Sequence, residues 1–136
     1  MIYSKVRVCR PDVDELQSSP LVDYPFVPES KFRIVTLFEE PACLVAHEEW
    51  YKDNDTEWVF FNETLMIVQS GSAEITWWNP PDWTDRGSVI VQPGDVFLCP
   101  RGARMWWKIL SDEPFRRIVV DIPSPGFDFQ TVKSLV

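Results

Sequence analysis

The stretch PGDVFLCPRGARMWW, residues 93–107, places two tight turns and two short apolar segments in close succession. Pro93 and Pro100 fix φ just before each change of direction, and Gly94 and Gly102 supply the backbone freedom that tight turns need. The apolar segments VFLC and MWW follow the turns directly. A chain that reverses this often is typical of a small β barrel.

Further runs of alternating, β-branched and aromatic residues lie on both sides of this stretch, separated by turn formers. The predicted strands are KFRIVTLFEE (31–40), CLVAHEEWY (43–51), two strands within EWVFFNETLMIVQ (57–69) bent around Asn62-Glu63, SAEITWW (72–78), SVIVQ (88–92), VFLC (96–99), RMWWKIL (104–110) and FRRIVVDI (115–122). We expect Gly71 to close an antiparallel hairpin between the second bent strand and SAEITWW. The regular spacing indicates an all-β sandwich or barrel.

The chain of 136 residues is most simply one domain. We expect an irregular N-terminal arm over residues 1–30, a barrel over 31–122 ended by Pro123, and a tail over 123–136 that packs along the outside. Within the arm we predict a short strand near Tyr3 to Val8 and one helical turn in PDVDELQSS, residues 11–19. An arm of this kind is a candidate contact with a second subunit, so a homodimer is expected.

The formal net charge is −8, and no cluster of Lys or Arg offsets it. Nucleic acid and anionic membranes are bound through clustered cations, so neither is expected as a partner. No segment approaches the roughly 20 apolar residues that span a bilayer, and no secretory leader is recognisable, which favours the cytoplasm. Cys9, Cys43 and Cys99 are far apart in sequence and are expected to be buried and reduced.

The segment VQPGDVFLCPRGARM resembles the second conserved motif of the cupin superfamily, with Gly94, Pro100 and Gly102 at its matching positions. The preceding VFFNETLMIVQSGSAEI resembles the first cupin motif. SDEPFRRIVVDIPSPGF resembles the closing strand of small single-domain cupins of the ethanolamine-utilisation type. The resemblance implies an all-β, single-domain cupin, that is, a double-stranded β-helix or jelly-roll barrel.

The chain departs from the cupin pattern at the metal ligands. Two His, a Glu and a later His hold a divalent metal in metal-binding cupins, and these positions fall here on Trp58, Phe60, Thr64 and Met105. These side chains are not credible ligands for such ions, so we predict no metal site and no cofactor. In an alternative, a bulge at Asn62-Glu63 turns Glu63 inward, but even with the sole histidine the metal would be under-coordinated.

The same positions predict an apolar ligand pocket. Alternate residues of an extended strand share a face. The predicted lining residues are Trp58, Phe60, Thr64, Met66, Met105 and Trp107. They favour a flat apolar or aromatic ligand through stacking, while Trp106 faces outward. The loop NPPDWTDRG, residues 79–87, is a candidate lid, and the tryptophans near it either close the pocket or lie in a dimer interface.

CLVAHEEWY is the richest source of acid–base groups. His47, Glu49 and Tyr51 share one face of this predicted strand at about 7 Å intervals. A carboxyl group buried beside aromatic rings has a raised pKa, and histidine titrates near neutrality, so these residues are the candidate catalytic groups. In the alternative interpretation they face solvent, and the opposite face of the strand forms the core.

Three functions are compatible with these features. The first is a metal-independent enzyme that isomerises, cyclises or cleaves a small apolar or aromatic metabolite by acid–base chemistry. The second is a non-catalytic module that binds such a molecule. The third is a metal-dependent oxygenase or lyase with atypical ligands. Fold class alone does not select among them.

Overall fold

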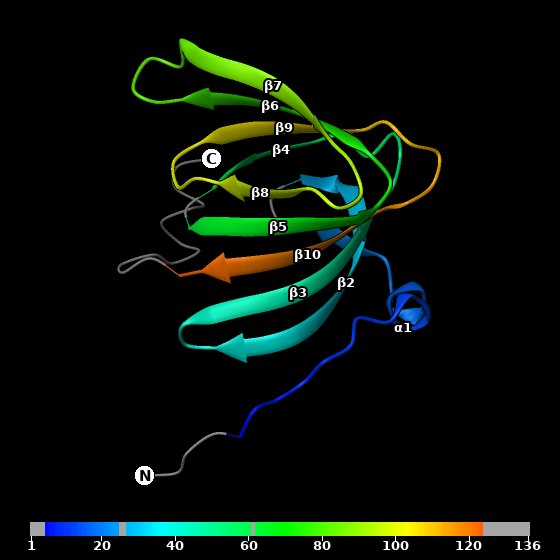
Figure 1. Ribbon diagram of the computed structural model, residues 1–136. Coiled ribbons are helices and arrows are strands. Elements are labelled where there is room, and N and C mark those ends of the chain that lie inside the picture. Colours follow the sequence, from blue (N-terminus) through cyan, green and yellow to red (C-terminus); the bar gives the residue numbers. More distant parts are fainter. Residues whose placement is uncertain (1–4, 25–26, 61, 124–136) are drawn as a thin grey trace.

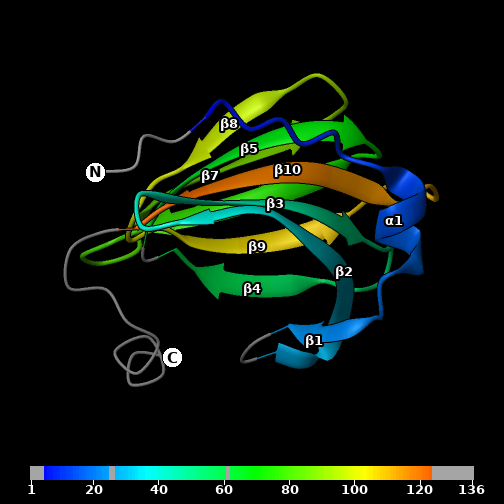
Figure 2. The same ribbon diagram turned by 90° about the horizontal axis from the view of Figure 1, so that it is seen from below.

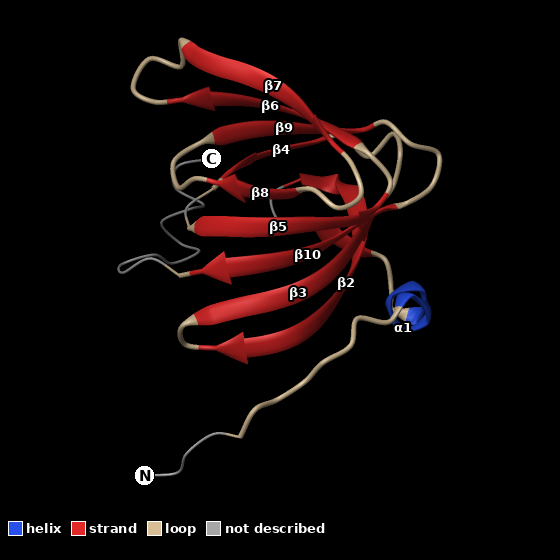
Figure 3. Cartoon of the chain, in the orientation of Figure 1, coloured by secondary structure: helices blue, strands red, loops and turns tan. Residues whose placement is uncertain are grey.

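The computed structural model describes residues 5–24, 27–60 and 62–123, which form one short helix and ten strands (Figures 1 and 3). In chain order these are α1 (Val13–Ser18), β1 (Val22–Tyr24), β2 (Val27–Glu40), β3 (Cys43–Trp50), β4 (Thr56–Val59), β5 (Glu63–Ser70), β6 (Ala73–Asn79), β7 (Asp85–Val91), β8 (Val96–Cys99), β9 (Arg104–Ile109) and β10 (Phe115–Ile122). Each strand predicted from residue 31 onward is present, and β10 ends next to Pro123 as expected. No helix in these ranges is long and apolar enough to cross a membrane.

The strands form two antiparallel sheets that face each other across the core (Figure 2). One sheet has the order β1-β2-β3-β10-β5-β8, and the other has the order β4-β9-β6-β7. The interior is filled mainly by aromatic and aliphatic side chains from both sheets, including Trp50, Met66, Val68, Ile75 and Trp107. The expected all-β jelly-roll barrel is confirmed.

The two turns of residues 93–107 are formed as predicted. Gly94 and Gly102 both adopt a φ of 91°, and a Cβ atom at either position would meet no other atom within 4 Å. Glycine is therefore required by the backbone angle and not by lack of space. The Gly94 N–H donates to the carbonyl oxygen of Val68 at 2.9 Å, and the Gly102 N–H donates to that of Phe60 at 2.6 Å. These bonds fasten the first turn to β5 and the second turn to the residue that follows β4.

The predicted hairpin at Gly71 is wrong. Strand β5 pairs with β10 and β8, whereas β6 pairs with β7 and β9 in the other sheet. The chain therefore crosses between the sheets at this turn. Ser72 bonds instead to the turn between β9 and β10, where its carbonyl oxygen accepts from the Leu110 N–H at 2.9 Å. A turn signal shows where a chain reverses, but not which strands pair.

The N-terminal arm differs partly from its prediction. Helix α1 is present, and the Asp12 side chain caps it by accepting a hydrogen bond from the Asp14 N–H at 2.9 Å. The predicted strand near Tyr3 to Val8 is absent over residues 5–8, and residues 3 and 4 lie outside the described ranges. Strand β2 begins at Val27, before the expected barrel start at residue 31. The predicted packing of the tail falls on residues 124–136, which are also outside these ranges.

The cysteines were expected to be buried, and this holds for one of them. Cys99 is fully buried, and burial raises the pKa of its thiol to about 12, so the thiol is unreactive. Cys43 is half-buried and Cys9 is exposed. The prediction is wrong for Cys9, because its side chain lies on an exposed part of the N-terminal arm.

Candidate functional site

Both faces of β3 are buried, and its pairing with β10 shows which face points into the barrel. Glu48 lies opposite Arg117, and Trp50 belongs to the interior core. His47 and Glu49 alternate with these residues and therefore point to the outer face. Helix α1 packs against β2 and β3 (Figure 2). It explains why residues on the outer face of β3 are also shielded from water.

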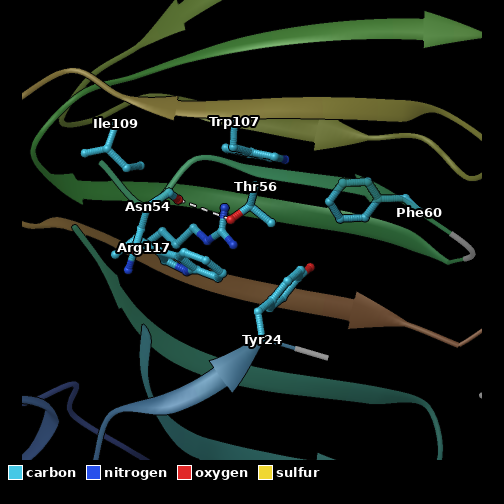
Figure 4. Close-up of a pocket in the computed structure, with 8 residues that line it drawn as sticks. Tyr24, Asn54, Thr56, Phe60, Trp107, Ile109 and Arg117 are labelled. Atoms are coloured by element: carbon cyan, nitrogen blue, oxygen red, sulfur yellow. Dashed lines mark hydrogen bonds between the residues drawn. The ribbon is translucent and has the colours of Figure 1, made fainter. Parts of the chain in front are cut away.

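A small cavity of about 10 Å³ lies between the sheets. It is lined by Tyr24, Trp50, Asn54, Thr56, Phe60, Trp107, Ile109 and Arg117 (Figure 4). A volume of this size holds about one water molecule. This cavity therefore has no room for a ligand larger than water, and a larger ligand has to displace some of the side chains that line it.

An ion pair between Arg117 and Glu48 is enclosed in this interior. Arg117 donates to Glu48 Oε1 from Nη2 at 2.9 Å and from Nε at 3.2 Å, and Trp50 Nε1 donates to the same oxygen at 2.8 Å. The guanidinium carbon lies 4.7 Å from the ring centre of Trp107 and 5.3 Å from that of Trp50. Cation–π attraction and the hydrogen bonds offset the cost of removing these charges from water. The pocket thus combines aromatic walls with a neutralised pair of charges.

Tyr24 projects from the three-residue strand β1 into the pocket region (Figure 4). Its ring packs edge-on against Trp50, Trp58 and Phe32, at centroid distances of 5.0, 5.1 and 5.6 Å. Burial, and secondarily the negative charge of Glu48, raise the pKa of the Tyr24 phenol. The phenol is therefore a neutral hydrogen-bonding group at physiological pH.

A second polar group lies at the Thr64 end of the barrel. Thr64 Oγ1 donates to Asp121 Oδ1 at 3.3 Å across the β5–β10 pair. Burial raises the pKa of Asp121, while hydrogen bonds from Asn62 and Thr64 act in the opposite direction. These residues provide further polar atoms inside a largely apolar barrel.

The six residues predicted to bind a ligand all lie in or beside the interior, but only two line the cavity. Phe60 and Trp107 form part of its wall. Thr64, Met66 and Met105 are buried, and Trp58 is half-buried against the core. Trp106 is partly exposed, in agreement with its predicted outward direction. None of residues 79–87, the predicted lid, lines this cavity.

The residues at the cupin metal positions do not fit a metal. Trp58, Phe60, Thr64 and Met105 offer two aromatic rings, one hydroxyl already bonded to Asp121 and one thioether. Glu63 is exposed, so the alternative in which it turns inward is wrong. In residues 5–24, 27–60 and 62–123, no three His, Cys, Asp or Glu side chains are grouped so as to hold a metal ion.

Two of the three predicted catalytic residues, Glu49 and Tyr51, form a hydrogen-bonded cluster on the outer face of the six-stranded sheet. Tyr51 donates its hydroxyl to Glu49 Oε1, and Arg116 Nε donates to Glu49 Oε2 at 2.6 Å. Arg33 Nε donates to the Tyr51 hydroxyl oxygen at 2.8 Å. Burial of the Tyr51 phenol, together with its bond to Glu49, raises its pKa to about 12.

His47 lies beside this cluster and is almost completely buried. Burial lowers its pKa, which favours the neutral imidazole. Its Nε2 is the one buried side-chain nitrogen or oxygen without a hydrogen-bond partner in the described part of the chain. The expected position of His47, Glu49 and Tyr51 beside a ligand in the barrel is thus corrected, because the sheet separates them from the cavity.

The interior polar residues Glu48, Arg117 and Tyr24 were not predicted. The alternation along β3 contains a signal for the first of them, since Glu48 shares its face with Ala46 and Trp50. Placing Trp50 in the core would have placed Glu48 there as well. No comparable local signal identifies Tyr24, because two of its three ring contacts, Trp50 and Trp58, lie on strands distant in sequence.

No family model matches the chain and no curated protein sequence does, but many solved structures are similar to it. One is the cupin domain of Cnp3 from Schizosaccharomyces pombe, with a TM-score of 0.60, 19% identity, and coverage of 88% of this chain and 77% of that one. EutQ from Clostridium difficile gives a TM-score of 0.56 and 19% identity, covering 72% of each chain.

Oxalate decarboxylase from Lactobacillus farciminis, solved as a formate complex, is similar over 87% of this chain and 38% of its own, with a TM-score of 0.60 and 15% identity. Likeness at such low identity shows the fold and not the activity. The resemblance of residues 93–107 to a cupin motif and the similarity to EutQ both point to the same fold. The chain has the fold of the cupin superfamily.

Proposed function

We propose that the protein binds a small, planar, largely apolar molecule inside its barrel, without a metal and without converting it. The observation that supports this most is the Arg117–Glu48 pair, held among aromatic rings at the cavity wall. Aromatic walls favour flat conjugated ligands. Because the two charges neutralise each other, a neutral ligand fits better than a charged one.

The ligand would take the space that Tyr24 now occupies. The cavity itself holds about one water molecule, so a ring can enter only if a side chain leaves. Tyr24 belongs to a three-residue strand bonded to β2 alone, which makes it the easiest wall residue to move. The ligand ring would then stack near Trp50 and Trp107, with its polar atom near Thr56 or Asn54.

Calorimetric titration with 2-naphthol tests this proposal, with 2-decalol as a saturated, non-planar analogue. We expect saturable 1:1 binding of 2-naphthol, at least tenfold weaker binding of 2-decalol, and recovery of the ligand unchanged. Trp107→Leu is expected to weaken binding at least tenfold, while Trp106→Leu, on the outer face, leaves it unchanged. Absence of binding, or equal effects of the two substitutions, contradicts the proposal.

A second candidate is the metal-independent acid–base enzyme with His47, Glu49 and Tyr51 as its catalytic groups. It is favoured by the hydrogen bond between Tyr51 and Glu49 and by the free Nε2 of buried His47. A substrate would have to reach the outer face beneath α1. If conversion of any bound molecule is detected by NMR, His47→Gln should abolish it. Unchanged conversion in this variant would exclude His47 from the reaction.

The proposed setting is a homodimer in the cytoplasm, with a small molecule as partner and neither nucleic acid nor membrane. The net charge of −8 supports this choice, since polyanionic partners are repelled. The three cysteines suit a reducing compartment, because the structure records them as free thiols.

A further inference from the structure

The outer face of the six-stranded sheet bears a patch of apolar side chains, of which three are exposed and four half-buried among the described residues. The patch comprises Leu65 and Ile67 of β5, Val96 and Leu98 of β8, and Ile118, Val120 and Ile122 of β10. Leu65 lies opposite both Leu98 and Val120, so the three strands form one surface. Val96 is 61% exposed, Leu98 56% and Ile122 47%.

The equivalent face of the four-stranded sheet is different. Its outward side chains are mainly polar or charged, and they include Glu57, Glu74, Arg104 and Lys108. Antiparallel sheets that face water normally alternate apolar residues inside with polar residues outside. The outer patch breaks this pattern, and extended apolar patches of this kind mark interaction surfaces.

Two valines of the N-terminal arm are further apolar side chains that the described residues leave exposed. Val6 is 93% exposed and Val8 69%. Between them, Arg7 pairs with Glu40 and lies over the ring of Phe38, both on β2. Arg7 therefore contacts the sheet of its own chain, while the valines on either side of it stay exposed.

From these features we infer that two copies of the chain pack together through their outer patches, each with its arm laid on the other copy. The inference rests on the proposed homodimer and adds which face joins the copies. Arg7 holds the arm at β2, whereas β8 forms the opposite edge of the same sheet, so the arm does not cover its own patch. In a two-fold symmetric dimer, the patch and the arm of each copy would be covered by the other copy.

The distribution of charge along the chain also supports a second copy as the partner. The arm segment KVRVCR, residues 5–10, has three cations and no acid in a chain of net charge −8. Arg7 is already paired with Glu40 of its own chain. Lys5 and Arg10 are therefore the cations that, placed on a second copy, reduce the repulsion between two acidic molecules. A dimer stabilised in this way is expected to weaken as salt screens the contact.

The test measures the mass of the full chain by analytical ultracentrifugation at micromolar concentration. We expect the wild type to have twice the chain mass and Leu98→Lys to raise the dimer dissociation constant at least tenfold. Ile90→Lys is the matched control, because Ile90 is 57% exposed but lies on the other sheet. The double variant Val6→Asp with Val8→Asp should also dissociate, while circular dichroism confirms that every variant is folded.

Each outcome has a distinct meaning. A monomeric wild type overturns both the homodimer and the interface, and is the result expected if residues 124–136 of the same chain cover the patch. A dimer that Leu98→Lys leaves intact, or that Ile90→Lys disrupts, overturns the interface and leaves the homodimer standing. A dimer sensitive to Leu98→Lys but not to the arm variant overturns the role of the arm.

Discussion

Two neighbouring acid–arginine pairs lie on opposite faces of one sheet. Glu48 pairs with Arg117 inside the barrel, and Glu49 pairs with Arg116 beneath the outer surface. The inner arginine side chain is 9% exposed and lies among aromatic rings, while the outer one is 16% exposed and shares its carboxylate with Arg33. Of two adjacent acid–arginine pairs of the same chemistry, one therefore contributes Arg117 to the cavity wall, where we propose ligand binding, and the other forms a hydrogen-bonded network on the opposite face.

Breaking the inner pair is expected to have the largest effect. Arg117→Met leaves Glu48 as an uncompensated charge in the barrel, and a change of this kind costs about 3–5 kcal/mol of unfolding free energy. Urea unfolding measures this cost. The double variant Glu48→Gln with Arg117→Met removes the unpaired charge and should be more stable than Arg117→Met alone. Equal stability of the two would mean that the inner pair is not effectively buried.

The outer pair should be less sensitive. Glu49→Gln keeps one of the two oxygens, so it can still accept from Tyr51 or from Arg116. Water reaches Arg116 and Arg33 more easily than it reaches Arg117. We expect a loss of about 2 kcal/mol in the same urea experiment. A loss larger than that of Arg117→Met would reverse the comparison between the two faces.

The faces of β3 illustrate what the sequence could predict. Alternation sorted residues 43–51 correctly into two sets, but it could not assign the sets to inside and outside, because α1 buries the outer one. Turns marked by Pro and Gly at residues 93–102 were predictable because their cause is local. The sheet crossing at Gly71 and the position of Tyr24 depend on distant strands, so local patterns did not reveal them.

The stability of the protein should depend on pH through His47, which lies on the outer face of β3. Burial lowers the pKa of His47, so the unfolded chain binds more protons than the folded one. His47 makes its full contribution to the free energy of unfolding above about pH 6.5, the pKa of histidine in the unfolded chain. This contribution is lost as the pH falls towards the lower pKa of His47 in the folded chain. The charged groups that act on it are Arg116, Glu49 and Glu15.

Urea midpoints measured between about pH 8 and pH 5 check this. The wild type should lose stability towards acid more steeply than His47→Gln. Parallel curves for the two proteins would show that His47 titrates alike in the folded and unfolded states.

A chelator should have the smallest effect. Because the residues at the cupin metal positions are aromatic, hydroxyl and thioether groups, EDTA is expected to leave the melting temperature and 2-naphthol binding unchanged. Metal analysis of protein purified without chelator provides the check. Stoichiometric iron, manganese, nickel or zinc, lost together with stability on chelation, would contradict the proposed metal-free pocket.

The most direct test of a ligand site inside the barrel is fluorine NMR of protein labelled with 5-fluorotryptophan. Single Trp→Phe substitutions assign the resonances of Trp50, Trp107 and Trp106. On titration with 2-naphthol, the signals of Trp50 and Trp107 should shift together and saturate, while that of Trp106 stays in place. A shift confined to Trp106, or no shift at all, would contradict the central claim that the barrel interior is the binding site.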